Sequence, residues 1–372
     1  MKNIILSIVA LLILGIGGFF GYQYFSSMKG SPFPDNGPLI TQPEKTTQSF
    51  GLPTPYDPAT ITSLTYDPKT PVVGRYAKPG VSLVSIIDDY AYIVDDHSGF
   101  RILDISDPKL PTPVGYVKVD STVDSILLFG NRAYVGIGGL PYKPDFRIYD
   151  INDRTTPKEI GRFQGDKNFG LLTVGPSYVH GNTLFLLDTP ILHVLDISNP
   201  ASPTEIAQYT HPDPSTNMRE MAMVGEYLYI ASGMPGVLIL DVSNPRNPNY
   251  KGAYDTKGYP EGVVARGNKL YVADKEGLGL TILDVTKQEV PKVLATEYTE
   301  DRPFIGMDAG VLVGETAFMR SSGGVSKYDI SGDKIQDLKQ GAGFPGYTWG
   351  VAVHNGYTYL ANDQNGLIVL KL

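Results

Sequence analysis

From residue 61 to the C-terminus, short apolar runs of strand length alternate with turn residues. One stretch shows the pattern clearly, with apolar runs at 262–266, 270–273, 280–283 and 291–294. The first two runs are separated by Gly267-Asn268, a dipeptide that tolerates positive φ and favours a tight hairpin. The pattern predicts a unit of four short antiparallel strands.

The same unit recurs along the chain. The phrase Leu103–Pro108 (LDISDP) returns at 195–200 and 240–245, and three looser copies share its central Asp. These residues, 43–46 positions apart, are Asp104, Asp150, Asp196, Asp241, Asp284 and Asp329. One further step reaches the closing run 366–372, which makes seven units. Four strands in about 45 residues is the size of a propeller blade, whereas solenoid coils are shorter and sandwich domains are longer.

The two ends of the repeat region complement each other. The last unit stops after its third strand at Leu372, and residues 66–76 are similar to the fourth-strand region of the first unit, 106–116. A lone fourth strand at one end can complete the last blade and remove the exposed sheet edges. We therefore predict an all-β fold, a seven-bladed β-propeller whose N-terminal strand closes the last blade.

These repeats resemble the LVIVD-repeat family, surface-type proteins of bacteria and archaea related in architecture to WD-repeat propellers. The matching residues are Tyr92–Asp95, Gly99-Phe100, Leu103–Pro108, Pro113 and Gly115-Tyr116. Units one, four and five match best, while the third and sixth depart from the pattern. The resemblance covers about residues 61–372 and implies the propeller fold. It implies no shared catalytic residues, so the function has to be argued from the site.

The N-terminal segment is predicted to anchor the chain in a membrane. Residues 4–25 contain no charged side chain, and a helix of about 20 residues spans the hydrocarbon layer. The segment lacks an Ala-x-Ala-like site, so we expect an uncleaved anchor within 1–30, with a cleaved signal peptide as the alternative. Residues 31–60, rich in Pro and Gly, are predicted to be a flexible linker. The propeller, 61–372, would then lie outside the cytoplasm, at the cell surface or in the periplasm.

Composition excludes several classes of function. The formal net charge of −8 argues against a nucleic-acid partner. The absence of cysteine removes disulfides, thiolate metal sites and a cysteine nucleophile. The five His residues show no zinc-binding spacing, and no Gly-x-Ser-x-Gly elbow occurs. An enzyme of one of these common types is therefore not expected.

The repeated Asp residues are predicted to be architectural. An Asp at the start of a turn accepts hydrogen bonds from backbone N–H groups just after it. A single functional site has no reason to be copied in every blade, so the positions that differ between blades are the more informative ones.

A propeller surrounds a central channel. In each blade the first strand begins, and the second strand ends, at the same face of the ring, so the side chains at these positions are predicted to gather around the mouth of the channel at that face. The first-strand positions are Ser82, Asp124, Gly175, Arg219, Glu261, Asp308 and Trp349. The second-strand positions are Asp95, Ile137, Asp188, Ser232, Asp274, Ser321 and Asn362. We predict a ligand-binding mouth formed by Asp124, Arg219, Glu261, Asp308 and Trp349. Asp95, Asp188 and Asp274 could hold Ca²⁺ through oxygen ligands, or could simply open hairpin turns.

Three functions remain open on the sequence alone. The favoured one is a binding module for a protein or glycan partner. The second is an acid/base or metal-assisted lyase or hydrolase that uses the carboxylates of the mouth. The third is a structural or adhesion protein of the cell surface. An ion pair between Arg219 and Glu261 or Asp308 would weaken the ligand hypothesis, because the mouth would then satisfy its own charges.

Overall fold

The computed structural model describes residues 72–371 apart from 95–98, 139–144, 166–176, 214–215, 275–278, 298–307 and 322–323. The side chains of 308–309, 321 and 339–341 also lie outside the description. All described residues belong to one compact unit of the chain, Leu52–Leu372.

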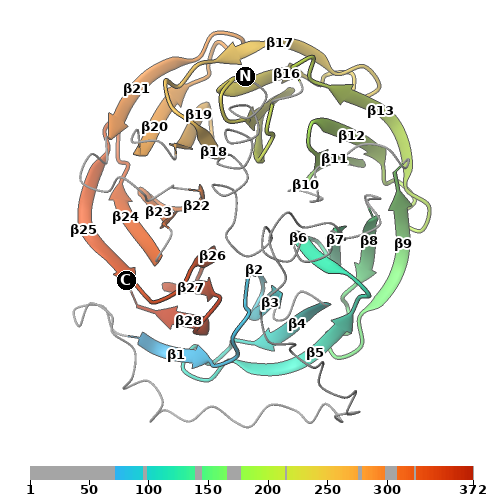
Figure 1. The fold of residues 1–372 in the computed structure, drawn as a ribbon, viewed down its shortest axis with the longest axis vertical. Coiled ribbons are helices and arrows are strands. Elements are labelled where there is room, and N and C mark those ends of the chain that lie inside the picture. Colours follow the sequence, from blue (N-terminus) through green and yellow to red (C-terminus); the bar gives the residue numbers. More distant parts are fainter. Residues whose placement is uncertain are drawn as a thin grey trace, which may run out of the picture. The chain divides into compact units, whose positions relative to one another are not determined.

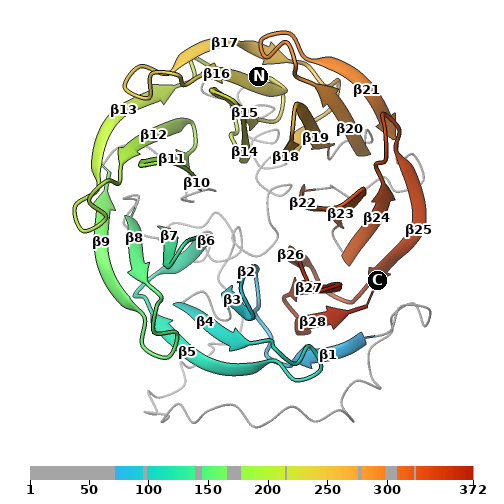
Figure 2. The ribbon, with the colours of Figure 1, turned by 180° about the vertical axis from the view of Figure 1, so that it is seen from behind.

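The described strands form seven four-stranded antiparallel sheets, which are arranged as blades around a central axis (Figure 1, and from behind in Figure 2). Blade 1 contains β2 (Leu83–Ile87), β3 (Tyr90–Val94), β4 (Gly99–Asp104) and β5 (Thr112–Lys118). Blade 2 contains β6 (Thr122–Phe129), β7 (Arg132–Gly138), β8 (Asp145–Asp150) and β9 (Lys158–Gln164). Blade 3 contains β10 (Ser177–His180), β11 (Thr183–Asp188), β12 (Ile191–Asp196) and β13 (Thr204–Thr210). Blade 4 contains β14 (Glu220–Val224), β15 (Tyr227–Ala231), β16 (Val237–Asp241) and β17 (Asn249–Tyr254).

The remaining blades follow in the same order. Blade 5 contains β18 (Pro260–Arg266), β19 (Lys269–Asp274), β20 (Gly279–Asp284) and β21 (Lys292–Glu297). Blade 6 contains β22 (Asp308–Val313), β23 (Thr316–Ser321), β24 (Gly324–Asp329) and β25 (Gln336–Gly343). Blade 7 contains β26 (Thr348–His354), β27 (Tyr357–Asn362), β28 (Gly366–Leu370) and β1 (Val72–Tyr76).

Blade 7 closes the ring as the sequence predicts. Its outermost strand is β1, which pairs antiparallel with β28 through Tyr76↔Leu367 and Gly74↔Val369. The two ends of the repeat region therefore share one sheet, and no described strand is left as an unpaired fragment. The prediction of a seven-bladed propeller with an N-terminal closing strand is confirmed.

The predicted anchor at 4–25 and the linker at 31–60 lie outside the described residues. Within the part of the chain that the structure describes, no helix has the length and apolar character needed to cross a membrane.

Apolar side chains fill the space between neighbouring blades. One such cluster joins Ala222 and Tyr229 of blade 4 to Val263, Leu270 and Val272 of blade 5. An aromatic residue stands at the same register position in the second strand of every blade, with at most 6% of its surface exposed: Tyr92, Tyr134, Phe185, Tyr229, Tyr271, Phe318 and Tyr359. Burial of these rings is the largest single hydrophobic contribution that each blade repeats.

The antiparallel pairing gives the ring two faces. At the mouth face, the first and third strands of each blade begin and the second ends; at the turn face, the first and third strands end. The six repeated Asp residues lie at the turn face. Each carboxylate accepts a hydrogen bond of 2.8–3.0 Å from the backbone N–H two residues on: Asp104, Asp150, Asp196, Asp241, Asp284 and Asp329. The architectural interpretation of these residues is confirmed.

A glycine in the fourth strand lets neighbouring blades meet at these turns. A Cβ added at Gly161 would lie 1.8 Å from the carbonyl oxygen of Pro200, in the turn of the next blade. At Gly115 the corresponding distance to the Arg154 carbonyl oxygen is 2.0 Å. No side chain fits so close to backbone, so both positions require glycine.

Candidate functional site

Three of the predicted mouth residues occupy β-bulges in the innermost strands. The register of β6, β18 and β26 shifts so that the ladder to the second strand skips Asp124, Glu261 and Trp349, respectively. A bulge twists the strand and redirects the extra side chain, and bulges are common next to binding sites. Equivalent bulges in three blades therefore present three chemically different side chains at the mouth face.

In blade 6 the bulge falls one residue later than counting along the sequence suggests. Asp308, which the count places level with Glu261 and Trp349, pairs with Arg320, and Ala309 is the residue skipped in the ladder. Asp308 begins β22 at the mouth face. Its side chain lies outside the description, so its part in the site stays a prediction.

Glu220 and Arg320 form the charged centre of the mouth, and sequence reasoning missed both. Burial raises the pKa of Glu220 to about 7, although a hydrogen bond of 3.2 Å from the Val263 N–H and the charge of Arg320 act in the opposite direction. Burial also lowers the pKa of Arg320 to about 10, against the attraction of Glu261 and Glu220. An acid that titrates near neutrality thus lies close to a guanidinium that stays charged.

The strand registers show how these two residues could have been found. Arg320 occupies the position that Ala231, Ala273 and Ala361 hold in blades 4, 5 and 7. Glu220 occupies the position of Gly262 in blade 5 and Gly350 in blade 7. Every other blade has an uncharged residue level with Arg320, so a charged side chain there is a signal of a special role that a full alignment of the seven units contains.

Arg219 links blades 4 and 5 at the mouth. Its Nη2 lies 3.9 Å from Oε1 of Glu261, at the outer limit of an ion pair and beyond hydrogen-bonding distance. The Nε of Arg219 is buried and has no hydrogen-bond partner among the described residues. The contact with Glu261 reduces the free charge of the mouth and so weakens the ligand hypothesis, but it leaves a buried donor on Arg219 available.

The three predicted Ca²⁺ ligands belong to blades 1, 3 and 5, and the structure gives two of them local partners. Oδ2 of the buried Asp188 lies 3.5 Å from Nε2 of His193. Asp274 accepts a hydrogen bond of 3.0 Å from Thr256. Asp95 lies outside the described residues. In the part of the chain described, no three His, Asp or Glu side chains are grouped so that they could hold a metal ion, and a Ca²⁺ site stays a prediction.

The alternative interpretation, that this position opens a hairpin turn, is seen directly in blade 7. There Asn362 stands where blade 5 has Asp274, and its Oδ1 accepts hydrogen bonds from the backbone N–H groups of Gln364 (3.2 Å) and Asn365 (2.8 Å). A side-chain oxygen at this position therefore shapes the turn in at least one blade.

Asp274 and His193 differ from Asn362 in being buried titratable groups. Burial raises the pKa of Asp274 to about 7, despite its hydrogen bond from Thr256. Its Oδ2 is buried without a partner among the described residues. Burial alone would lower the pKa of His193, but contacts with Asp188 and with Glu205, 2.5 Å from Nδ1, outweigh it and raise that pKa. The Oδ2 of Asp188 and the Nε2 of His193 are also buried without a hydrogen-bond partner among the described residues.

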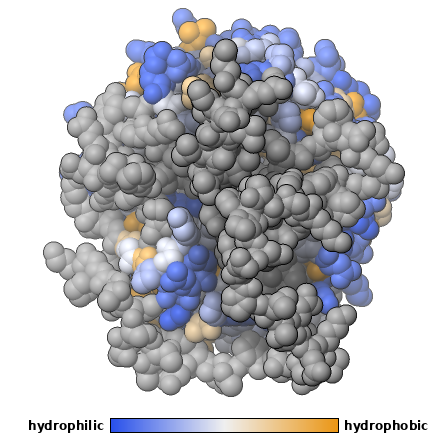
Figure 3. All heavy atoms as spheres, in the orientation of Figure 1, coloured by the Kyte–Doolittle hydropathy of each residue, from blue (hydrophilic) through white to orange (hydrophobic). Residues whose placement is uncertain are grey.

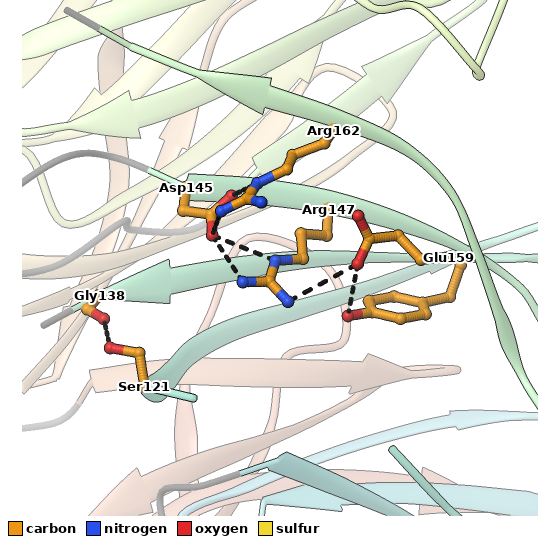
Figure 4. A network of polar contacts seen from close by, with 7 residues as sticks. Ser121, Gly138, Asp145, Arg147, Glu159 and Arg162 are labelled. Carbon is orange, nitrogen blue, oxygen red and sulfur yellow. Dashed lines mark hydrogen bonds and ion pairs between the residues drawn. The ribbon is translucent and has the colours of Figure 1, made fainter. Parts of the chain in front are cut away.

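A second charged cluster, in blade 2, is internally satisfied. Figure 4 shows the Asp145 carboxylate between Arg147 and Arg162, with Arg162 donating from both Nε and Nη2 at 2.7 Å. Arg147 also donates to Asp145, from Nη2 at 2.8 Å, and lies 3.6 Å from Glu159. Because each carboxylate already has a guanidinium partner, this cluster stabilises the blade and offers no vacant group to a ligand.

Exposed aromatic side chains set one part of the mouth face apart. In the view of Figure 3 the described surface is mainly hydrophilic, and hydrophobic residues occur singly or in small groups. Trp349 is 38% exposed and Tyr347, just before β26, is 59% exposed. Their ring centroids are 5.7 Å apart. Tyr347 was missed because it precedes the strand, where the pattern of apolar positions carries no information.

Comparison with known families agrees with this architecture. The LVIVD repeat family matches five segments of the chain, at residues 80–119, 179–211, 217–256, 257–288 and 345–370. The chain is an LVIVD-repeat β-propeller. The matched segments fall in blades 1, 3, 4, 5 and 7 of the LVIVD propeller. The expectation that the third unit departs from the family pattern was therefore wrong, whereas blade 6 is indeed unmatched.

Solved structures show the same fold at low sequence identity. The β-propeller domain of Cps50 (Swd1) from Myceliophteria thermophila superposes with a TM-score of 0.63 at 10% identity, covering 82% of the LVIVD propeller chain and 99% of that domain. The computationally designed Ika8 protein has a TM-score of 0.56 at 10% identity, covering 82% and 100% of the two chains. No curated protein sequence matches the chain. At this identity the structural likeness establishes the fold alone.

Proposed function

We propose that the LVIVD propeller is a binding module that recognises a protein or glycan partner through its mouth face. LVIVD-repeat propellers commonly serve as interaction modules. The observation that carries the proposal is the contrast at the bulges, where equivalent positions hold Asp124, Glu261 and Trp349. A rigid ring that varies its side chains at one rim is the arrangement by which scaffolds acquire recognition.

Two further features of the mouth support recognition. Two buried polar atoms, the Nε of Arg219 and the Oδ2 of Asp274, have no hydrogen-bond partner among the described residues, and such atoms are costly unless a ligand or water satisfies them. The exposed pair Tyr347 and Trp349 supplies large apolar area on side chains with few rotatable bonds. We place the propeller outside the cytoplasm, tethered by the uncharged segment 4–25.

Capture of partners by the full chain from an envelope extract tests the proposal. We expect Trp349→Ala and Glu261→Ala to lose the captured partner, because both residues occupy bulges of the mouth. Phe129→Ala is the matched control, since Phe129 is 49% exposed at the turn face, where β6 ends. Equal capture by all three variants would show that the mouth face is not the binding surface.

Acid/base catalysis is a second candidate, and one observation favours it. The pKa of Glu220 is raised to about 7 beside the charged Arg320, which suits a group that gives and takes a proton near neutral pH. A lyase or hydrolase of this kind would lose turnover in Glu220→Gln while still capturing its substrate. Turnover that survives Glu220→Gln would exclude this role for Glu220.

A further inference from the structure

The aromatic pair at blade 7 is displayed on an unusually well-fixed loop. The backbone N–H of Tyr347 donates to Oδ1 of Asp363 at 2.8 Å, and the Asp363 N–H donates to the Tyr347 carbonyl at 3.0 Å. Asn365 Nδ2 donates to the carbonyl of Pro345 at 2.8 Å. Gly346 has φ +84°, and a Cβ there would lie 2.2 Å from Asp363 Oδ1. Loop and turn are locked together, so little ordering entropy would be lost when a ligand contacts the rings.

The charged centre of the mouth connects directly to this loop. Nη1 of Arg320 donates to the carbonyl oxygen of Thr348, the residue between the two aromatics, at 2.8 Å. Around Arg320 lie one further guanidinium, Arg219, and the carboxyl groups of Glu220 and Glu261. Two positive groups offset two acidic ones, one of which titrates near pH 7. This group has no surplus negative charge with which to bind a cation.

The described residues expose less apolar area at the mouth than the centre of a typical protein interface has. Among the described residues, the large hydrophobic side chains exposed at this face are Met234, Tyr347 and Trp349. Met234 is in blade 4, between β15 and β16, and the aromatic pair is in blade 7. A stable protein interface buries about 800 Å² per partner around an apolar centre. Two aromatic rings surrounded by polar groups suit a ligand that is smaller than a protein surface and that has one apolar face and polar groups at its edge.

We infer that the Tyr347–Trp349 pair is a sugar-binding subsite that takes a neutral pyranose unit of an oligosaccharide. One face of a pyranose presents polarised C–H bonds, which are attracted to the electron-rich face of an aromatic ring. Its hydroxyl groups bind planar carboxylate and amide groups, such as Asp363 and the exposed Gln364 in the same pair of turns. This inference rests on the proposed function of the mouth face and narrows its partner to a glycan.

Trp349 is the only tryptophan of the chain, so its fluorescence reports on this subsite alone. We would titrate the full chain with chitohexaose, cellohexaose and mannohexaose, and with hexagalacturonate and spermine as charged probes. At least one neutral hexasaccharide is expected to shift the emission. Tyr347→Ala keeps the reporter and should weaken that binding about tenfold, from the loss of one stacking contact. Phe129→Ala at the turn face should leave the binding unchanged, and circular dichroism verifies that each variant is folded.

Each other outcome overturns the inference in a recognisable way. Binding of the charged probes only, or binding that Tyr347→Ala does not weaken, would show that the pair is not a neutral sugar subsite. If no hexasaccharide binds but Trp349→Ala still abolishes capture of a partner that resists glycosidase digestion, the mouth recognises protein and only the sugar inference fails. If neither binding nor capture depends on the mouth, the proposed function fails as well.

Discussion

The carboxyl groups of the turn face and those of the mouth face are held in opposite ways. At the turn face, the backbone and side-chain hydrogen bonds of the following turn lower the pKa of Asp196 and Asp329 below the ordinary value. At the mouth face, burial raises the pKa of Glu220 and Asp274 to about 7. The same chemical group therefore stabilises the fold at one face and costs stability at the other.

The difference between the two faces matches which residues are repeated in the sequence and which are not. Turn-face residues recur in each blade because every blade needs the same turn. Mouth-face residues such as Glu220 and Arg320 stand where blades 5 and 7 have glycine and alanine, and they bring charge into a buried position. Proteins keep such unfavourable groups mainly at functional sites, where the fold elsewhere compensates. The comparison thus separates the architecture of the ring from its function.

The largest expected effect is a loss of stability between about pH 5 and about pH 8. The folded pKa of Asp274, about 7, lies above its ordinary value of 3.8. The folded state therefore binds the proton more tightly than the unfolded state, which stabilises the fold at low pH. This contribution to the free energy of unfolding, on the order of 3 kcal/mol for a buried group, is lost as pH rises through 7. Urea unfolding at the two pH values measures it. Asp274→Asn should reduce this slope and leave the part that the raised pKa values of Glu220 and His193 contribute, and an unchanged slope in this variant would contradict the assignment.

A substitution where two blades meet should cost somewhat less. Gly161→Ala places a Cβ against the Pro200 carbonyl of the next blade and should lower the free energy of unfolding by about 2 kcal/mol. Gly130→Ala is the control, because Gly130 has φ +61° but no atom near its Cβ position, and it should cost about 1 kcal/mol. Equal urea midpoints for the two variants would show that the close approach of blades is unimportant.

Removing one repeated Asp should have a smaller effect. Asp104→Ala loses the hydrogen bond from the Ser106 N–H and should cost about 1 kcal/mol. Asp104→Asn keeps an acceptor oxygen, as Asn199 does in its own turn, and should be close to neutral. Chemical unfolding of both variants checks this, and an equal loss in Asp104→Asn would mean that the charge, not the turn geometry, is what stabilises.

The smallest effect on stability is expected for a substitution in the proposed binding site at the mouth. Tyr347 is 59% exposed, so Tyr347→Ala should change the free energy of unfolding by less than about 0.5 kcal/mol. Thermal unfolding is sufficient to test it. A loss of more than about 1 kcal/mol would assign Tyr347 to the packing of the ring and weaken its role in binding.

The fold was predictable because its determinants are local and repeated. The spacing of Asp104, Asp150 and their equivalents sets the number of blades, and the sequence around Gly74 matches the missing strand beside β28. The mouth was predictable only in part. Glu261 and Trp349 were identified by counting from the repeats, but the count gives no sign that the bulge of blade 6 falls at Ala309, one residue later than in blade 5. Tyr347 was missed because its exposure is set by the hydrogen bonds of a loop.

Residue-specific NMR titration of the Asp and Glu carboxyl groups tests the contrast between the two faces most directly. Glu220 and Asp274 are expected to titrate near pH 7. Four carboxyl groups of the turn face are expected to titrate below the ordinary value of 3.8: Asp196, Asp241, Asp284 and Asp329. If all six groups titrated together between about 3.5 and 4.5, as in unstructured peptides, the two faces would not differ and the account would be contradicted.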